Sequence, residues 1–205
     1  MRVIGLTAPV QTGKIQLTHV FKNHGYRFVD LNDFIYDDRR AGSAKYDYYQ
    51  RRWPGCLDEE GVETGRFYQT LDRATFQDLL NADMAMVTLH TLEEIEKARR
   101  EGVDVVLSWE YLARISQHLS IDQLLIFQSD NTIWLDRLKK RATELGWSTI
   151  PTDDQLWAII DMLDVRPETI NQECIRTFSP KQISRIDVSP DDWGACNLAT
   201  LLRSL

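Results

Sequence analysis

The sequence predicts an α/β protein with a mostly parallel sheet flanked by helices. Short apolar runs rich in β-branched residues alternate with segments of helical period through most of the chain, which is the order of elements in a sheet covered on both faces. A turn-rich segment that ends in Gly13 and Lys14 separates the first such run from the first helical segment. The 205 residues suit one domain of ordinary size. We therefore expect a single domain over 1–205, with a helical insertion at about 33–100.

The opening of the chain has the strand, loop, helix, strand order of a βαβ unit. Met1–Leu6 is an apolar run typical of a buried strand, and Lys14–His24 places its apolar residues on one side of a helix. Gly25 is a natural stop for that helix, and Tyr26–Leu31 is a second short strand. Such a unit is the building block of a parallel sheet.

The alternation continues beyond one stretch, from Asn32 to about Gly65, that shows no clean period. Helices are expected at Leu71–Ala85, Leu89–Arg100, Thr132–Leu145, Asp153–Leu163 and Leu198–Leu205. Strands are expected at Val103–Trp109, Leu124–Gln128 and Ser184–Val188. The helical insertion is therefore the one candidate for a small second lobe.

The amino-acid composition indicates the cellular compartment to expect and excludes some classes of binding partner. The formal net charge of −7 argues against a general nucleic-acid coat protein, which needs a cationic face. The three cysteines are far apart and have no metal-ligand spacing, which is typical of reduced thiols in a cytoplasmic protein. We expect no signal peptide and no membrane partner, because no window approaches the ~18 apolar residues of a membrane span. The sequence does not indicate an oligomeric state.

The segment at 8–15, APVQTGKI, is similar to the phosphate-loop pattern of Gly, four residues, Gly-Lys, then Ser or Thr. The backbone N–H groups of such a loop point at phosphate oxygens, and the following helix presents its positive end to the same anion. The ammonium group of Lys14 adds a charge over the outer phosphates. We therefore expect a nucleotide to bind through Thr12, Gly13, Lys14 and Ile15.

The loop departs from this pattern at its first and last positions and has a proline at its second, which makes it a degenerate Walker A loop. Ala8 replaces the first glycine, and Pro9 removes one N–H group. The serious departure is Ile15, because the Ser or Thr hydroxyl normally found there ligates the magnesium that bridges the outer phosphates. The sequence therefore leaves Mg²⁺ binding open.

A collinear series of short motifs resembles the dephospho-CoA kinase family, within the nucleoside-monophosphate-kinase group. The motifs are Val3–Thr7 with Gly13-Lys14, Val29–Asn32, Leu71–Arg73, Leu89-His90, Val105–Leu107, Arg137-Leu138 and Arg141. No single motif is strong, but their order and spacing run through nearly all of the chain and fade after about Leu145. The resemblance implies a P-loop kinase fold with a small helical acceptor and lid lobe. It also implies ATP as cofactor and a small nucleotide-type acceptor.

The resemblance also implies roles for basic residues and one histidine. Lys14 would hold the β- and γ-phosphates. Arg141, and with it Arg137, would stabilise charge on the transferred group. Arg73 and His90 would lie near the acceptor. From the residues alone, a structural histidine and a solvated basic helix face are equally good interpretations of His90 and the two lid arginines.

The acids of the motif series also differ from the family pattern. Asn32 stands where the family has its base, the second acid of an Asp-x-Asp pair, and an amide cannot take a proton. Asp30 is retained, Asp33 is adjacent, and Glu110 ends the Ser-Trp-Glu that replaces the family's Asp-x-Pro. Any of these three acids is a candidate for orienting the acceptor or helping to hold Mg²⁺. Asp30 alone is equally compatible with a solvated strand-end acid.

Three functions remain open from the sequence. The first is a divergent ATP-dependent phosphotransferase. The second is a catalytically impaired pseudokinase that serves as a binding or regulatory protein, suggested by Ile15 together with Asn32. The third and weaker one is a kinase for modified nucleotides or DNA, suggested by the aromatic and arginine residues of Tyr46–Trp53. That segment is also compatible with a folded surface loop.

Overall fold

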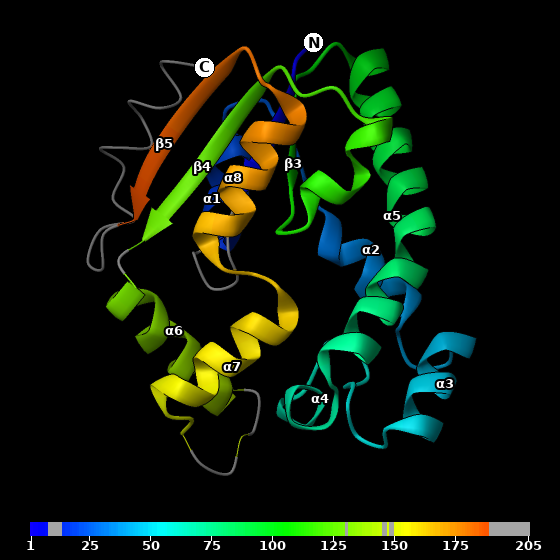
Figure 1. The fold of residues 1–205 in the computed structure, drawn as a ribbon. Helices are drawn as coiled ribbons and strands as arrows, with labels where there is room; N and C mark the ends of the chain where they lie inside the picture. Colours follow the sequence, from blue (N-terminus) through cyan, green and yellow to red (C-terminus); the bar gives the residue numbers. More distant parts are fainter. Residues whose placement is uncertain (8–13, 130, 145–146, 148–149, 189–205) are drawn as a thin grey trace. The chain divides into compact units, whose positions relative to one another are not determined.

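The structure is a computed structural model that describes residues 1–7, 14–129, 131–144, 147 and 150–188 (Figure 1). The chain divides into two compact units. Unit 1 consists of Met1–Asp30, Thr91–Trp134 and the chain from Val165 onward, and unit 2 consists of Leu31–His90 and Leu135–Asp164. The predicted helix at Leu198–Leu205 lies outside the described residues. Within the described part of the chain, no helix combines the length and apolar character needed to cross a bilayer.

Unit 1 is built on a five-stranded sheet in which all paired strands are parallel, in the order β2-β3-β1-β4-β5. The strands are β1 (Val3–Thr7), β2 (Arg27–Asp30), β3 (Val105–Ser108), β4 (Gln123–Ser129) and β5 (Gln182–Val188). All five residues of β1 are buried, as the central strand of a doubly covered sheet requires. The predicted fold class, a parallel sheet flanked by helices, is confirmed.

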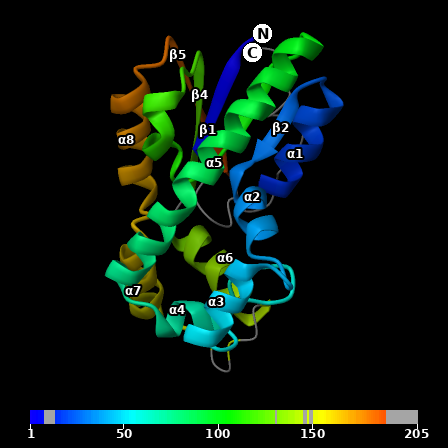
Figure 2. The same ribbon diagram turned by 90° about the vertical axis from the view of Figure 1, so that its right-hand side faces the viewer.

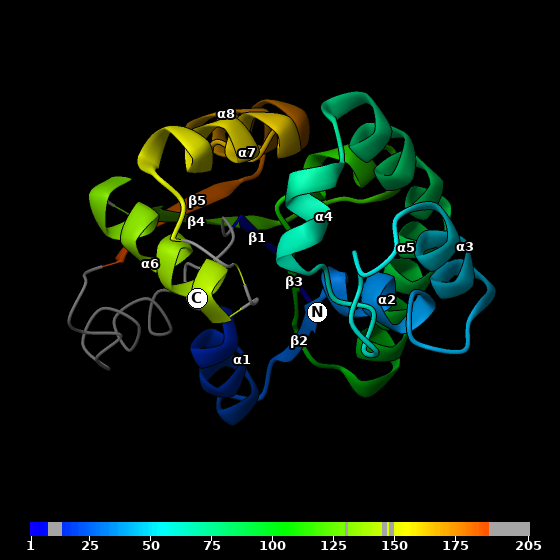
Figure 3. The same ribbon diagram turned by 90° about the horizontal axis from the view of Figure 1, so that it is seen from below.

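Helices cover both faces of this sheet. Figures 2 and 3 show α1 (Lys14–Asn23) and α8 (Pro167–Phe178) on opposite sides of the strands. Ile4 and Leu6 of β1 belong to a buried apolar cluster that also contains Leu17 and Phe21 of α1. On the other face, an added Cβ at Gly5 would stand 2.8 Å from a side-chain carbon of Ile121, so this position takes a glycine because its neighbours approach so closely. That face also receives the 3₁₀ helix η1 (Leu112–His118).

Helix α5 (Arg73–Glu101) is a single helix of 29 residues. The prediction of two helices, Leu71–Ala85 and Leu89–Arg100, was therefore wrong about the break. No glycine or proline occurs between these segments, and Val87 inside the expected gap is completely buried. Burial against the rest of the protein thus stabilises the helix across residues 86–88, where helix propensity is only moderate.

The stretch without a clean period holds three short helices of unit 2. They are α2 (Leu31–Asp38), α3 (Ala44–Arg52) and α4 (Gly65–Thr70). The predicted strand Tyr26–Leu31 is one residue too long at each end, since β2 is Arg27–Asp30 and Leu31 is the buried first residue of α2. Unit 2 also contains α7 (Asp153–Leu163) and most of α6 (Asn131–Glu144). Helix α7 has the predicted bounds and begins with a capping box between Thr152 and Gln155.

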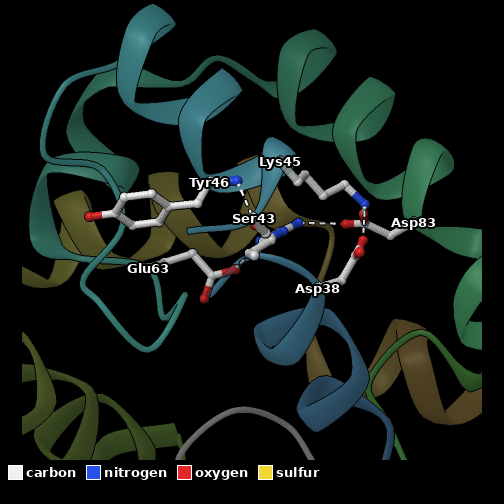
Figure 4. Close-up of polar contacts among 7 residues, drawn as sticks. Asp38, Ser43, Lys45, Tyr46, Glu63 and Asp83 are labelled. Atoms are coloured by element: carbon white, nitrogen blue, oxygen red, sulfur yellow. Dashed lines mark hydrogen bonds and ion pairs between the residues drawn. The ribbon is translucent and has the colours of Figure 1, made fainter. Parts of the chain in front are cut away.

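A buried ion network lies inside unit 2. Arg39 at the end of α2 is 3% exposed, and its guanidinium lies 2.5 Å from the Asp83 carboxylate and 2.7 Å from that of Glu63. Lys45 contacts Asp83 as well, as Figure 4 shows. Burial by itself would lower the pKa of Arg39, but the two carboxylates outweigh it and raise that pKa above its ordinary value. The two carboxylates therefore stabilise the charged form of the buried Arg39 guanidinium.

Two cysteines lie in the core, Cys56 in unit 2 and Cys174 in unit 1. Burial raises the pKa of Cys56 to about 11 and that of Cys174 to about 12. At pH 8 the nucleophilic thiolate is about one molecule in a thousand for Cys56 and about one in ten thousand for Cys174. We therefore expect both thiols to resist an aromatic disulfide reagent until the protein unfolds.

The measurement uses a Cys196→Ser variant, because Cys196 lies outside the described residues. Native protein at pH 8 should release almost no chromophore, and protein in concentrated guanidinium should release two equivalents at once. Rapid reaction of either thiol in the native state would contradict the burial of that cysteine.

Candidate functional site

The carboxyl ends of the first three strands form one edge of the sheet in unit 1. Asp30, the last residue of β2, pairs in register with Ser108, the last residue of β3, and Ser108 pairs with Leu6 of β1. Strand β1 is flanked by β3 and β2 on one side and by β4 and β5 on the other. The chain order therefore reverses at β1. Ligands of open α/β sheets bind outside the carboxyl ends of the strands at such a switch point.

Helix α1 begins at this same edge. Strand β1 ends at Thr7 and α1 starts at Lys14, so the strand, connection and helix occur in the predicted order. Thr12 and Gly13 fall in the segment 8–13, which lies outside the described residues, and Lys14 and Ile15 are described by their helical backbone alone. The first turn of α1 presents its positive dipole end and its N–H groups toward the edge. A phosphate site here stays a prediction.

Asp30 and Ser108 share the sheet face that α1 covers. Residues that pair in register on neighbouring strands point to the same face of the sheet. Leu6 of β1, which pairs with Ser108, packs in the apolar cluster with Leu17 and Phe21 of α1, so this face is the one that α1 covers. Ser108 is completely buried. Its hydroxyl oxygen has no hydrogen-bond partner within the described part of the chain. Sequence reasoning did not select Ser108. The signal available was its position, where the resembled family has the acid of its Asp-x-Pro.

Glu110 lies two residues beyond the end of β3, in unit 1, and is buried. Its neighbour Trp109 is fully buried, and the indole lies edge-on to Tyr111 with ring centroids 5.6 Å apart. Trp109 therefore has a packed position immediately after the end of β3. Asp30 thus ends β2, Glu110 follows the end of β3, and Lys14 is the first residue of the helix that follows β1 in the chain.

The opposite face of the same edge is held by α8. The Thr7 hydroxyl donates a hydrogen bond of 2.6 Å to the Asn171 side-chain carbonyl, and both residues are buried. Helix α8 therefore fixes the end of β1 immediately before the segment 8–13. Sequence reasoning missed this helix, although Pro167 at its first turn is a helix-start signal.

Several predicted acceptor residues lie in unit 2, close to α2. Asn32 and Asp33 occupy the first turn of that helix, and Asp33 is exposed. The His90 ring lies 5.3 Å from the ring of Phe34, so His90 packs against the same helix. Arg73 is different. It is the exposed first residue of α5 and forms an ion pair with Asp164 at 3.4 Å.

The segment Tyr46–Trp53 is mostly the helix α3, so the interpretation as a surface loop was wrong. Tyr49 is buried under the Arg39 guanidinium, 5.0 Å from ring centroid to carbon. Tyr48 is 46% exposed, and Arg52 lies over the Trp53 ring at 5.2 Å. Only part of the aromatic group therefore faces solvent.

Arg137 and Arg141 lie on α6, one turn apart and half-buried. The Arg141 guanidinium lies 3.3 Å from the Glu144 carboxylate. The predicted residues thus divide between the units. Lys14, Asp30 and Glu110 belong to unit 1, and the residues of unit 2 are Asn32, Asp33, Arg73, His90, Arg137 and Arg141.

No family model and no curated protein sequence matches the chain. Solved structures do match it. A dephospho-CoA kinase from Campylobacter jejuni is similar with a TM-score of 0.56 at 11% sequence identity, over 98% of this chain and 96% of that protein. The protein TT1252 from Thermus thermophilus gives a TM-score of 0.55 at 16% identity, over 100% of this chain and 97% of that protein. The chain therefore has a dephospho-CoA-kinase-like P-loop fold, and the fold implied by the resemblance is confirmed.

Proposed function

We propose that the chain is a divergent ATP-dependent phosphotransferase that acts on a small nucleotide-type acceptor. The observation that supports the proposal is the edge of unit 1, where β2 ends at Asp30 and the connection from β1 leads into α1 at Lys14. An anion-binding helix end beside a carboxylate is the combination that phosphoryl transfer to a hydroxyl requires. The similarity of fold to a dephospho-CoA kinase over nearly the full length of both chains supports the same class.

The nucleotide phosphates are held by the first turn of α1. Its N–H groups, with those of Thr12 and Gly13, donate to the β- and γ-phosphate oxygens, and the Lys14 ammonium neutralises their charge. Arg137 and Arg141 contribute further positive charge to the transferred group. Mg²⁺, when bound, adds charge neutralisation at the same oxygens.

The acceptor hydroxyl is oriented by an acid. One of the carboxylates of Asp30, Asp33 and Glu110 takes the hydroxyl proton as the new O–P bond forms, and the bond from the γ-phosphorus to the bridging oxygen breaks to release ADP. Asn32, Arg73 and His90 would bind the acceptor.

The direct test incubates the protein with γ-labelled ATP, Mg²⁺ and a panel of acceptors that includes dephospho-CoA and nucleosides. We expect Lys14→Ala to lower transfer by about 100-fold or more, because it removes the charge held on the outer phosphates. Lys22→Ala is the matched control. Lys22 lies in the last turn of the same helix, at the end away from the site, and should leave transfer unchanged. Native protein with no transfer above Lys14→Ala would contradict the proposal.

A second candidate, a pseudokinase with a binding or regulatory role, is favoured by Ile15 together with Asn32. These residues remove a metal ligand and the probable base at the chemical centre. Calorimetry with ATP separates the candidates when it accompanies the transfer assay. Binding without transfer, and a large gain of transfer in the Ile15→Ser/Asn32→Asp double variant, would support the pseudokinase.

A further inference from the structure

Ser108 carries a buried polar atom that the fold itself does not use. Its hydroxyl oxygen is completely shielded from solvent and has no hydrogen-bond partner among the residues described. Leaving a buried hydroxyl unpaired costs about 1–3 kcal/mol, so such atoms are rare unless a ligand or water completes them. The carboxyl end of β3, where Ser108 lies, is where a ligand of this fold class would be found.

The neighbour of Ser108 in the sheet supplies the second oxygen donor. Asp30 pairs with Ser108 in register, so their Cα atoms are about 4.8 Å apart and their side chains share the face covered by α1. Two oxygen ligands of one Mg²⁺ ion stand at most ~4.2 Å apart, because each lies 2.0–2.1 Å from the metal. A hydroxyl and a carboxylate on in-register partners fit that requirement.

We propose that Ser108 and Asp30 form the protein's half of a divalent-cation site, and that the Ser108 hydroxyl replaces the one that Ile15 cannot provide. The inference rests on the proposed function, because nucleotide phosphates and water complete the ligand set. No group of three or more His, Cys, Asp or Glu side chains suited to a metal occurs in the described ranges. Two protein oxygens with phosphate and water are nevertheless the usual arrangement for Mg²⁺.

The alternative is that Ser108 has a purely structural role. The thermal stability of a Ser108→Ala variant distinguishes this role from cation binding. If the hydroxyl forms no hydrogen bond in the cation-free protein, removing it does not lower the stability of the fold. Ser108→Ala should therefore leave the melting temperature in EDTA unchanged or slightly higher. A drop of several degrees in EDTA would mean that the hydroxyl already has a partner, and would overturn the proposal.

The binding test titrates Mn²⁺, alone and with a nonhydrolysable ATP analogue, while the signal of free Mn²⁺ is followed by electron paramagnetic resonance. We expect Ser108→Ala and Asp30→Asn each to weaken Mn²⁺ binding by about 10–100-fold. Adding Ile15→Ser to the Ser108→Ala variant should recover most of the affinity, because it returns a hydroxyl to the start of α1. Ser184→Ala, a hydroxyl removed from edge strand β5, is the matched control and should change nothing.

The outcomes separate this inference from the proposed function. Unchanged Mn²⁺ affinity in Ser108→Ala, or native protein that holds no Mn²⁺ in either titration, would overturn the cation site. Binding of the analogue in EDTA is a separate measurement. If the analogue binds there and ATP is still a phosphoryl donor, the phosphotransferase survives even when the cation site does not.

Discussion

Replacing Asp83 by alanine will lower the free energy of unfolding by about 3–5 kcal/mol. Asp83 is 0% exposed and accepts hydrogen bonds from both Arg39 and Lys45. Asp83 and Glu63 are the two carboxylates that contact the buried Arg39 guanidinium in the described part of the chain. Without Asp83, the positive charge of Arg39 is balanced by Glu63 alone of these two. A buried charge left without its partner is among the most destabilising changes known for a single site.

Urea unfolding of native protein and variants measures this effect. Asp37→Ala is the matched control, because Asp37 forms a surface ion pair with Arg40 at 3.2 Å and should cost less than about 1 kcal/mol. A second comparison removes both charges. Arg39→Met/Asp83→Leu should unfold at a higher urea concentration than Asp83→Ala, because the buried guanidinium that loses the Asp83 carboxylate in the single variant is removed as well. A loss below about 1 kcal/mol in Asp83→Ala would show that water or a rearranged side chain satisfies Arg39.

Gly61→Ala is expected to cost about 2–5 kcal/mol, from two causes that add. Gly61 has φ +81°, a conformation that costs a residue with a Cβ about 1–2 kcal/mol. In addition, the new Cβ would stand 2.4 Å from the carbonyl oxygen of Tyr36 and 2.8 Å from the backbone carbon of Arg39. Backbone atoms cannot rotate away as a flexible side chain does, so the loop must move. Its movement also displaces Glu63, which holds Arg39.

Gly25→Ala is the matched control, since Gly25 has the same φ of +81° but nothing within 4 Å of an added Cβ. Gly25→Ala therefore has the free-energy cost of the positive φ angle but no steric clash between the new Cβ and the backbone. The difference between the two variants in melting temperature or urea midpoint therefore reports the contact of Gly61 with the end of α2. Equal losses in Gly61→Ala and Gly25→Ala would mean that the close approach is relieved cheaply.

The parts of the fold that were predictable are those where burial follows a simple period. The strand, helix, strand opening and the bounds of α7 follow from apolar runs, a helical stripe and capping residues such as Thr152. The break expected before Leu89 was wrong because continuous packing holds α5 together where local propensity is modest. A helical insertion was expected over about 33–100, but the separate helices α2, α3 and α4 were not predicted, because they are short and a charged residue, Arg39, is buried at the end of α2.

Arg39 illustrates this limit. It continues the spacing of the buried residues Leu31 and Ile35 on α2, so the helical period does point it inward. A charged residue in that pattern is normally interpreted as solvated. Its partners Glu63 and Asp83 come from distant segments, and the sequence offers no means of pairing them. The Ser108 hydroxyl has the same character, because an unpaired buried atom is defined only by its neighbours in space.

The candidate site was predictable in part. Asp30 at the end of a strand, and Lys14 at the start of a helix, follow from the alternation of elements. The contribution of α8 through Asn171 was not predictable, because its partner Thr7 lies at the far end of the sequence. Side chains that support a site from a distant part of the sequence produce no short-range pattern by which the sequence could reveal them.

The position of β1 in the middle of the sheet has a consequence during protein synthesis. Val3 pairs with Val105, and Ile4 with Gln123, so this apolar segment is made long before either neighbour exists. Closing such long loops carries an entropic cost that delays sheet assembly, whereas helices made of local contacts form at once. A nascent chain released or stalled before β4 would therefore expose one unpaired edge of a mostly apolar strand, the kind of segment that aggregates or recruits a chaperone.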